Sequence, residues 1–182
     1  MKWFFKCFKQ YADFKGRARR KEYWWFMLIN IIIMFICIIG FIVPLAKMYF
    51  DDIAAGLDVD SFNEWELMQG IITNPFFYIY LIYNLAVLIP TYAVTVRRLH
   101  DIGKSGYWAF LYLGVSLLTS LVEVIPNTVA YGVIYLVIIA IYILFLVWMF
   151  TNSDYGPNKY GPNPKGEGNP TEESPTIVDS QF

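Results

Sequence analysis

Residues 24–46, WWFMLINIIIMFICIIGFIVPLA, contain no charged side chain, and this run constrains the fold more than any other feature. At a rise of about 1.5 Å per residue, a helix of this length crosses the hydrocarbon core of a bilayer, which is about 30 Å thick. The run is too long for the apolar region of a cleaved signal peptide, so we interpret it as an uncleaved signal anchor. The chain is therefore expected to fold in a membrane.

Three further apolar stretches follow, and together they predict an all-α membrane protein with four transmembrane helices. The chain is 57% hydrophobic and 16% charged, whereas soluble domains carry about 25% charged residues. Asn74 and Pro75 suit an N-cap and a first helical position, and Pro90 is expected to kink that helix. The turn EVIPNT predicts that the last two spans form a helical hairpin. We place the spans at 24–46, 76–96, 107–124 and 129–150.

Lysine and arginine are distributed unevenly, and this predicts the orientation. Residues 1–22 hold eight of the 14 basic residues and residues 97–104 hold three, whereas residues 47–75 hold one beside six acids. Because basic loops stay in the cytoplasm, both termini and the loop before the third span are predicted to be cytoplasmic. Aromatic residues then gather at the cytoplasmic interface, as aromatic belts do: Trp24, Trp25, Trp108, Trp148 and Tyr155.

This topology divides the chain into three parts. Residues 1–23 form a cytoplasmic, amphipathic and basic arm, and residues 24–150 form the membrane domain. Residues 151–182 form a cytoplasmic tail, which is rich in Gly, Pro, Asn and Glu. Such a composition cannot bury enough apolar surface to fold alone, so we expect disorder from about residue 166.

Residues 2–14, KWFFKCFKQYADF, predict an N-terminal interfacial amphipathic helix in the headgroup plane. One face carries apolar side chains at helical spacing and the other carries lysines: Trp3, Phe4, Cys7, Phe8, Tyr11 and Phe14 against Lys2, Lys6 and Lys9. Gly16 is expected to end this helix. Basic clusters beside a span attract anionic lipid, so the arm is a membrane anchor or a docking arm for a membrane protein partner. No nucleic-acid partner is expected.

The loop RRLHDIGKSGYW (97–108) carries the only histidine, and three of its possible chemistries have little support. A phosphate-binding P-loop needs a glycine where Arg98 stands. A metal site needs more ligands than His100 and Asp101, so no metal or other cofactor is expected. Catalysis through His100, Asp101 and Ser105 needs a base within reach of its target, and nothing in the sequence selects that arrangement.

Two interpretations of this loop stay open. Arg97, Arg98 and Lys104 suit the binding of an anionic group, because guanidinium groups bind phosphate with two hydrogen bonds. The structural alternative is that Arg97 and Arg98 complement the C-terminal dipole of the second span, while Gly103 forms a left-handed cap.

The spans themselves offer few chemical groups. Ser116, Thr119 and Glu123 share a helical face and predict a polar stripe inside the bundle. Interhelical hydrogen bonding is one role for it, and a path for a small solute is the other. Cys7 and Cys37 lack metal-site spacing and are expected to be free structural thiols.

Three stretches resemble the signature motifs of one family: FKGRARRKEYWW (14–25), RRLHDIGKSGYW (97–108) and YGPNKYGPNP (155–164). Over residues 1 to about 165, the chain is similar to the bacterial inner-membrane family catalogued as domain of unknown function 805 (DUF805). The resemblance implies a small, multi-spanning protein of the bacterial cytoplasmic membrane and carries over no catalytic residue. Tyr107 stands where that family suggests tryptophan, and the acidic loop is longer.

The predicted topology puts all three motifs on one side of the membrane, which suggests a single rim assembly. We expect arginines of the first two motifs to face acidic residues, with the tandem YGPN repeats folded as turns beneath them. The arginines are Arg17, Arg20, Arg97 and Arg98, and the acids are Glu22, Asp101 and Asp154.

The sequence thus predicts a non-enzymatic integral membrane protein whose basic cytoplasmic rim binds anionic lipid or a partner protein. A small transporter or channel component is the first alternative. A membrane enzyme acting on a lipid-linked phosphate is the second. The candidate binding residues are Arg17, Arg20, Arg97, Arg98, His100, Asp101 and Lys104.

Overall fold

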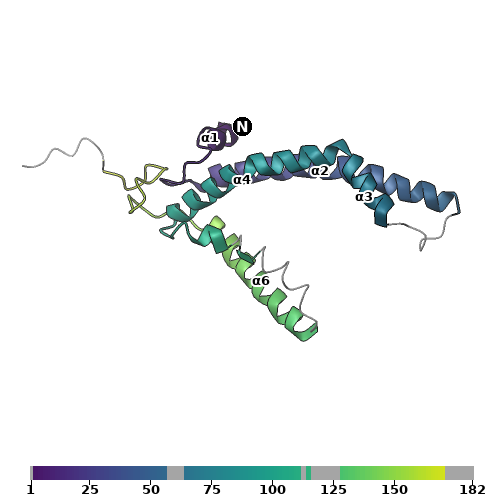
Figure 1. Ribbon diagram of the computed structural model, residues 1–182. Coiled ribbons are helices and arrows are strands. Elements are labelled where there is room, and N and C mark those ends of the chain that lie inside the picture. Colours follow the sequence, from purple (N-terminus) through teal and green to yellow (C-terminus); the bar gives the residue numbers. More distant parts are fainter. Residues whose placement is uncertain (1, 57–63, 112–113, 116–127, 171–182) are drawn as a thin grey trace, which may run out of the picture. The chain divides into compact units, whose positions relative to one another are not determined.

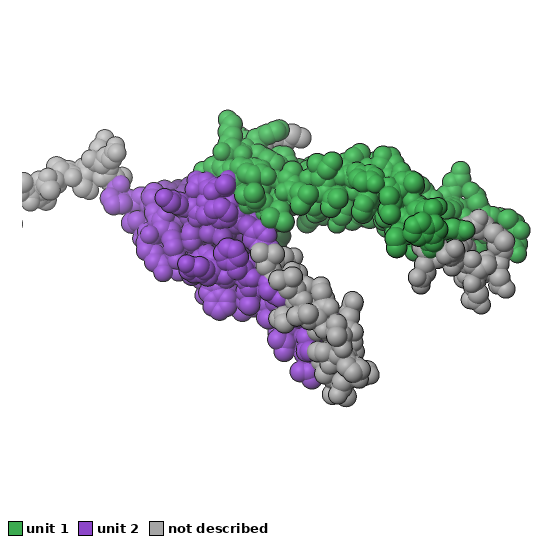
Figure 2. Space-filling model, in the orientation of Figure 1, with its two compact units in different colours: residues 1–11, 24–91 green, residues 12–23, 92–182 purple. Residues whose placement is uncertain are grey.

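The computed structural model describes residues 2–56, 64–111, 114–115 and 128–170, and these residues form helices and turns without a strand. The helices are α1 (Lys2–Lys9), α2 (Arg20–Ala54), α3 (Glu64–Thr73), α4 (Pro75–Asp101) and α6 (Thr128–Phe150) (Figure 1). The chain divides into two compact units (Figure 2). The first unit comprises residues 1–11 and 24–91, and the second comprises residues 12–23 and 92–182.

Among the described residues, three helices are long and apolar enough to cross a membrane, which fits the predicted all-α membrane class. They span Arg20–Asp51, Pro75–Asp101 and Gly132–Phe150, and they correspond to the first, second and fourth predicted spans. Of the third predicted span, residues 108–111 and 114–115 are helical, and most of the remainder lies outside the described residues. The predicted polar stripe of Ser116, Thr119 and Glu123 also lies outside them.

In the first unit, α2 and α4 pack side by side in opposite directions (Figure 1). The rings of Phe41 and Phe77 lie 6.3 Å apart, and further along the Tyr83 hydroxyl donates a 2.6 Å hydrogen bond to Asn30 Oδ1. The Asn30 amide donates in turn to the Phe26 carbonyl at 2.7 Å. A polar side chain within an apolar helix is thereby fully used by hydrogen bonds, one of them between helices.

The start of α4 follows the predicted capping chemistry. The Asn74 side-chain oxygen accepts a 2.9 Å hydrogen bond from the Phe76 N–H, and Pro75 is the first helical residue. Both predictions are confirmed. Pro90 lies inside the same helix and has no N–H to donate to the Ala86 carbonyl one turn earlier. Tyr11 follows α1, and its hydroxyl donates a 2.6 Å hydrogen bond to the Ala86 carbonyl instead.

The N-terminal helix is shorter than predicted, and part of its apolar face has a protein partner. The Phe4 ring stacks on Phe26 of α2 at 5.7 Å, and the Phe8 ring lies 5.9 Å from it. Cys7 is buried on the same side, and it is a free thiol, as is Cys37. The helix ends at Lys9, and Gly16 lies beyond it with a positive φ of 77°.

The segment between the first two predicted spans is more helical than expected. α2 continues to Ala54, and α3 lies within residues 47–75, for which the sequence predicts a loop. The acidic composition of this segment concealed an apolar pattern in α3, where Trp65, Met68 and Ile72 recur at helical spacing.

Candidate functional site

The interior of the second unit contains a group of charged side chains among apolar ones. Three arginines and two carboxylates are buried together, and we call them the arginine cluster: Arg17, Glu22, Arg97, Arg98 and Asp101. Arg98, Asp101 and Glu22 have an exposed fraction of 0%. The surrounding end of α4 is buried without interruption over residues 93–99. Charges leave water at this depth only when they are paired and hydrogen-bonded.

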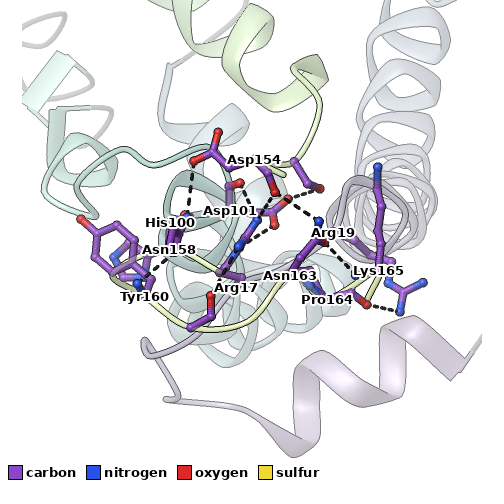
Figure 3. Close-up of polar contacts among 12 residues, drawn as sticks. Arg17, Arg19, His100, Asp101, Asp154, Asn158, Tyr160, Asn163, Pro164 and Lys165 are labelled. Atoms are coloured by element: carbon purple, nitrogen blue, oxygen red, sulfur yellow. Dashed lines mark hydrogen bonds and ion pairs between the residues drawn. The ribbon is translucent and has the colours of Figure 1, made fainter. Parts of the chain in front are cut away.

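Asp101 is the centre of the cluster (Figure 3). One carboxylate oxygen accepts from Arg17 Nε at 3.1 Å, and the other accepts from Arg98 Nη1 and from the Ser153 hydroxyl. A second ion pair joins Arg97 Nη1 to Glu22 Oε1 at 3.3 Å. The predicted facing of arginines and acids from the first two motifs is therefore confirmed for Arg17, Arg97 and Arg98.

Backbone carbonyls accept hydrogen bonds from the arginines and stabilise the remaining positive charge. Arg17 Nη1 donates to the Gly156 carbonyl and Nη2 donates to the Asp154 carbonyl, each at 2.7 Å. Three guanidinium groups face two carboxylates here, so one positive charge is in excess. The carbonyl groups of the C-terminal segment point their negative ends at Arg17 and so stabilise this excess positive charge.

The C-terminal end of α6 is held by arginines from elsewhere in the second unit. Arg98 donates to the carbonyls of Met149 and Thr151, and Arg20 donates to the Phe150 carbonyl at 3.1 Å. The last carbonyls of a helix have no partner within it and carry the negative end of its dipole. The structural interpretation pairs Arg98 with the end of its own helix, whereas its hydrogen bonds to carbonyls go to the end of α6 and its ion pair goes to Asp101.

The turn after α4 brings the cluster residues together. Gly103 has a positive φ of 71°, the Gly103 N–H donates to the His100 carbonyl, and the Lys104 N–H donates to the Leu99 carbonyl. This is a Schellman cap, so the predicted left-handed cap is confirmed. A Cβ atom on residue 103 would lie 2.7 Å from Asp154 Oδ2, so a side chain there would displace the Asp154 carboxylate.

The tandem YGPN repeats fold as turns against this assembly, as predicted. Asn158 and Asn163 hold equivalent positions, and each side-chain oxygen accepts a 2.9 Å hydrogen bond from the N–H two residues later. Their amide groups bind residues next to the cluster: Asn158 donates to the His100 carbonyl and Asn163 donates to the Asp154 carbonyl (Figure 3). Glu167 and Asn169, beyond the predicted start of disorder, still make hydrogen bonds to this segment.

His100 and Lys104 have separate surroundings. His100 Nδ1 lies 3.2 Å from the Gly16 carbonyl, and its ring stacks on Tyr160 with the ring centres 3.7 Å apart. The Lys104 ammonium lies 4.6 Å from the centre of the Trp148 ring. Among the candidate binding residues, the structure therefore brings Arg17, Arg97, Arg98 and Asp101 into one buried cluster and leaves these two half-buried beside it.

Sequence reasoning missed the side chains that join the C-terminal segment to the cluster. Ser153, Asn158, Tyr160 and Asn163 all contact cluster residues or their neighbours. The repeat itself predicted turns, but it did not show which groups those turns would bind.

A model of the family described as "Protein of unknown function (DUF805)" matches residues 11–162. The inner membrane protein YhaH of Escherichia coli (strain K12) is 38% identical over 115 residues, which cover 62% of this chain and 74% of that protein. The inner membrane protein YhaI of the same strain is 35% identical over 112 residues, covering 62% of this chain and 71% of that protein. No solved structure matches the chain. The family match contains every residue of the arginine cluster.

Proposed function

We propose that this chain, which belongs to the DUF805 family, is an inner-membrane protein whose exposed lysines bind anionic phospholipid. It crosses the bacterial cytoplasmic membrane several times, with both termini in the cytoplasm, and it is not an enzyme. Inner-membrane relatives and three long apolar helices support the location. The segregation of basic residues supports the orientation.

The proposal is supported by a difference between arginines, which are buried, and lysines, which are exposed. The arginines Arg17, Arg97 and Arg98 are buried and bound to groups of the chain itself. The lysines of the N-terminal arm stay exposed: Lys2 and Lys9 in the first unit, Lys15 and Lys21 in the second. Each basic residue near an anionic bilayer surface contributes about 1 kcal/mol of binding free energy. Lipid binding is therefore assigned to the lysines and the arginine cluster is a structural core.

The enzyme alternative requires His100, Asp101 and Lys104 to converge on one substrate. In the structure each has a different partner: Asp101 binds the buried arginines, His100 lies against Gly16 and Tyr160, and Lys104 lies over Trp148. This geometry favours the non-enzymatic proposal. The transporter alternative depends on a stripe, Ser116–Glu123, that lies outside the described residues.

Native mass spectrometry of the full chain in mild detergent tests the proposal. The wild type is equilibrated with equal amounts of phosphatidylglycerol and phosphatidylcholine, and the ratio of the two bound lipids is measured. We expect at least a several-fold preference for the anionic lipid, in line with about 1 kcal/mol per lysine.

A variant with Lys2, Lys9, Lys15 and Lys21 all changed to glutamine should lose most of this preference. Lys47→Gln is the control, because Lys47 is exposed but lies in the segment predicted to face outside. Equal binding of the two lipids by the folded wild type would refute the proposal.

A further inference from the structure

Beside the arginine cluster, the second unit has an open cleft of about 440 Å³. Its walls come from the N-terminal arm, the end of α4, the 105–110 segment and the second YGPN repeat, and they include Phe14, Val96, His100, Ser105, Phe110 and Tyr160. A mostly aromatic and aliphatic hollow with a few polar groups is the usual form of a small-ligand site. None of the predicted roles of this region uses it.

The orientation of His100 determines what this cleft can recognise. Because a carbonyl oxygen only accepts, the 3.2 Å contact with Gly16 makes Nδ1 the donor, so Nε2 of the neutral ring is an acceptor. His100 lines the cleft, and a Cβ atom built on Gly106 would lie 3.0 Å from Nε2, so a side chain at residue 106 would crowd this edge of the ring. The Ser105 hydroxyl lines the same cleft. Both groups suit a ligand that carries hydroxyl groups.

Lys159 lies next to Tyr160, which lines the cleft, and exposed aromatic side chains line another part of it. The exposed Lys159 places its ammonium 5.0 Å from the centre of the Tyr160 ring. Tyr107 and Phe110, which also border the cleft, are 82% and 57% exposed. Aromatic side chains of this kind favour the headgroup level of a bilayer, where a phosphate would lie within reach of a lysine.

We propose that this cleft binds the headgroup of an anionic phospholipid that carries free hydroxyl groups. Lys159 binds the phosphate, and the His100 Nε2 atom and the Ser105 hydroxyl bind the headgroup hydroxyls. The inference rests on the proposed function and deepens it, because it assigns one site and one headgroup chemistry to a general attraction for anionic lipid.

The test compares two lipids of equal charge in the same native mass spectrometry experiment. Phosphatidylglycerol carries two headgroup hydroxyls, and phosphatidylmethanol carries none. The wild type should retain phosphatidylglycerol about fivefold more strongly, which corresponds to one or two hydrogen bonds of ordinary strength. Ser105→Ala should reduce this discrimination and leave the binding of phosphatidylmethanol unchanged.

Lys159→Ala should weaken the binding of both lipids about tenfold, because it removes a charge-assisted hydrogen bond to phosphate. Lys165→Ala is the matched control: it removes the same charge from the same segment, at an exposed residue that pairs with Glu167 at 3.9 Å. Neither lysine belongs to the buried cluster, so both variants are expected to fold.

The outcomes separate this inference from the function on which it rests. Equal retention of the two anionic lipids, or equal effects of Lys159→Ala and Lys165→Ala, would overturn the cleft assignment. If the N-terminal lysine variant still loses its preference over phosphatidylcholine in that case, the general proposal stands. If the wild type never prefers anionic lipid, the proposed function fails first.

Discussion

The two units of this protein are stabilised in opposite ways. In the first unit the surface of the long helices is apolar: Ile31 and Phe35 of α2 are 61% and 62% exposed, while the neighbouring Asn30 is 8% exposed. In the second unit the interior is ionic, with Arg98 and Asp101 at 0% exposure. Because lipid is as apolar as leucine, burying apolar side chains gives little drive to helix association in a membrane. The first unit combines aromatic contacts with a few hydrogen bonds, and among the described residues the buried charges all lie in the second unit.

This comparison predicts that the largest loss of stability comes from the centre of the arginine cluster. Asp101→Asn keeps the shape of the side chain but leaves Arg17 and Arg98 buried without their carboxylate. Removing one partner of a buried ion pair costs about 3–5 kcal/mol. We expect a large fall in the thermal midpoint of the detergent-solubilised protein, measured by fluorescence-detected size exclusion after heating.

Asp13→Asn is the control for that measurement. Asp13 is exposed and accepts a hydrogen bond from the Lys15 N–H at the surface, so its effect should stay small. If the two variants melted together, the cluster would not be the core of the second unit.

A smaller effect should report on direct pairing within the cluster. Glu22→Arg and Arg97→Glu each place two like charges opposite one another across the present 3.3 Å contact, so each alone should be destabilising. The double variant restores opposite charges and should recover about 0.5–3 kcal/mol, the range of coupling between contacting residues. The thermal midpoints of the four proteins give this coupling. A double variant that loses the sum of the two single effects would rule out direct pairing.

The sequence predicts the apolar helices of the first unit better than the polar contacts of the second. Hydropathy predicted the apolar parts of α2, α4 and α6, and the Asn74–Pro75 cap predicted the start of α4, because both are local properties of the sequence. Composition obscured α3, whose apolar pattern lies among acids.

In the second unit, the motifs predicted which arginines and acids meet, but not what else those arginines bind. Arg98 reaches the end of α6, and Arg17 reaches carbonyls more than a hundred residues away. Such partners are backbone groups, which every residue carries, so no residue type marks them in the sequence. The sequence also did not show which carbonyls Asn158 and Asn163 would bind. An Asx turn fixes the local geometry through the side-chain oxygen, and it does not determine which group accepts from the side-chain NH₂.

A modest effect is expected where the first unit uses a single polar contact. Tyr11→Phe removes the hydroxyl that binds the Ala86 carbonyl, which Pro90 leaves without its helical donor. The expected cost is about 0.5–1.5 kcal/mol, the usual net contribution of one hydrogen bond. The same substitution in a Pro90→Ala background should cost almost nothing, because the introduced alanine supplies a backbone N–H to that carbonyl. Equal costs in both backgrounds, measured by thermal midpoint, would show that the hydroxyl does not act by replacing the helical donor that Pro90 lacks.

The smallest effect should come from the apolar surface of the first unit, and it separates exposure to lipid from burial in protein. Phe35→Ala removes a large side chain that is 62% exposed on a membrane helix. Helices in lipid gain little from such a side chain, so we expect the free energy of unfolding to change by less than about 0.5 kcal/mol and the thermal midpoint to shift little. Phe26→Ala, at 0% exposure beneath Phe4 and Phe8, makes the same chemical change and should cost several times more, as cavity-forming substitutions do. If the two alanine variants were equally destabilised, the exposed face of α2 would be packed against protein, and the contrast between an apolar surface and an ionic interior would not hold.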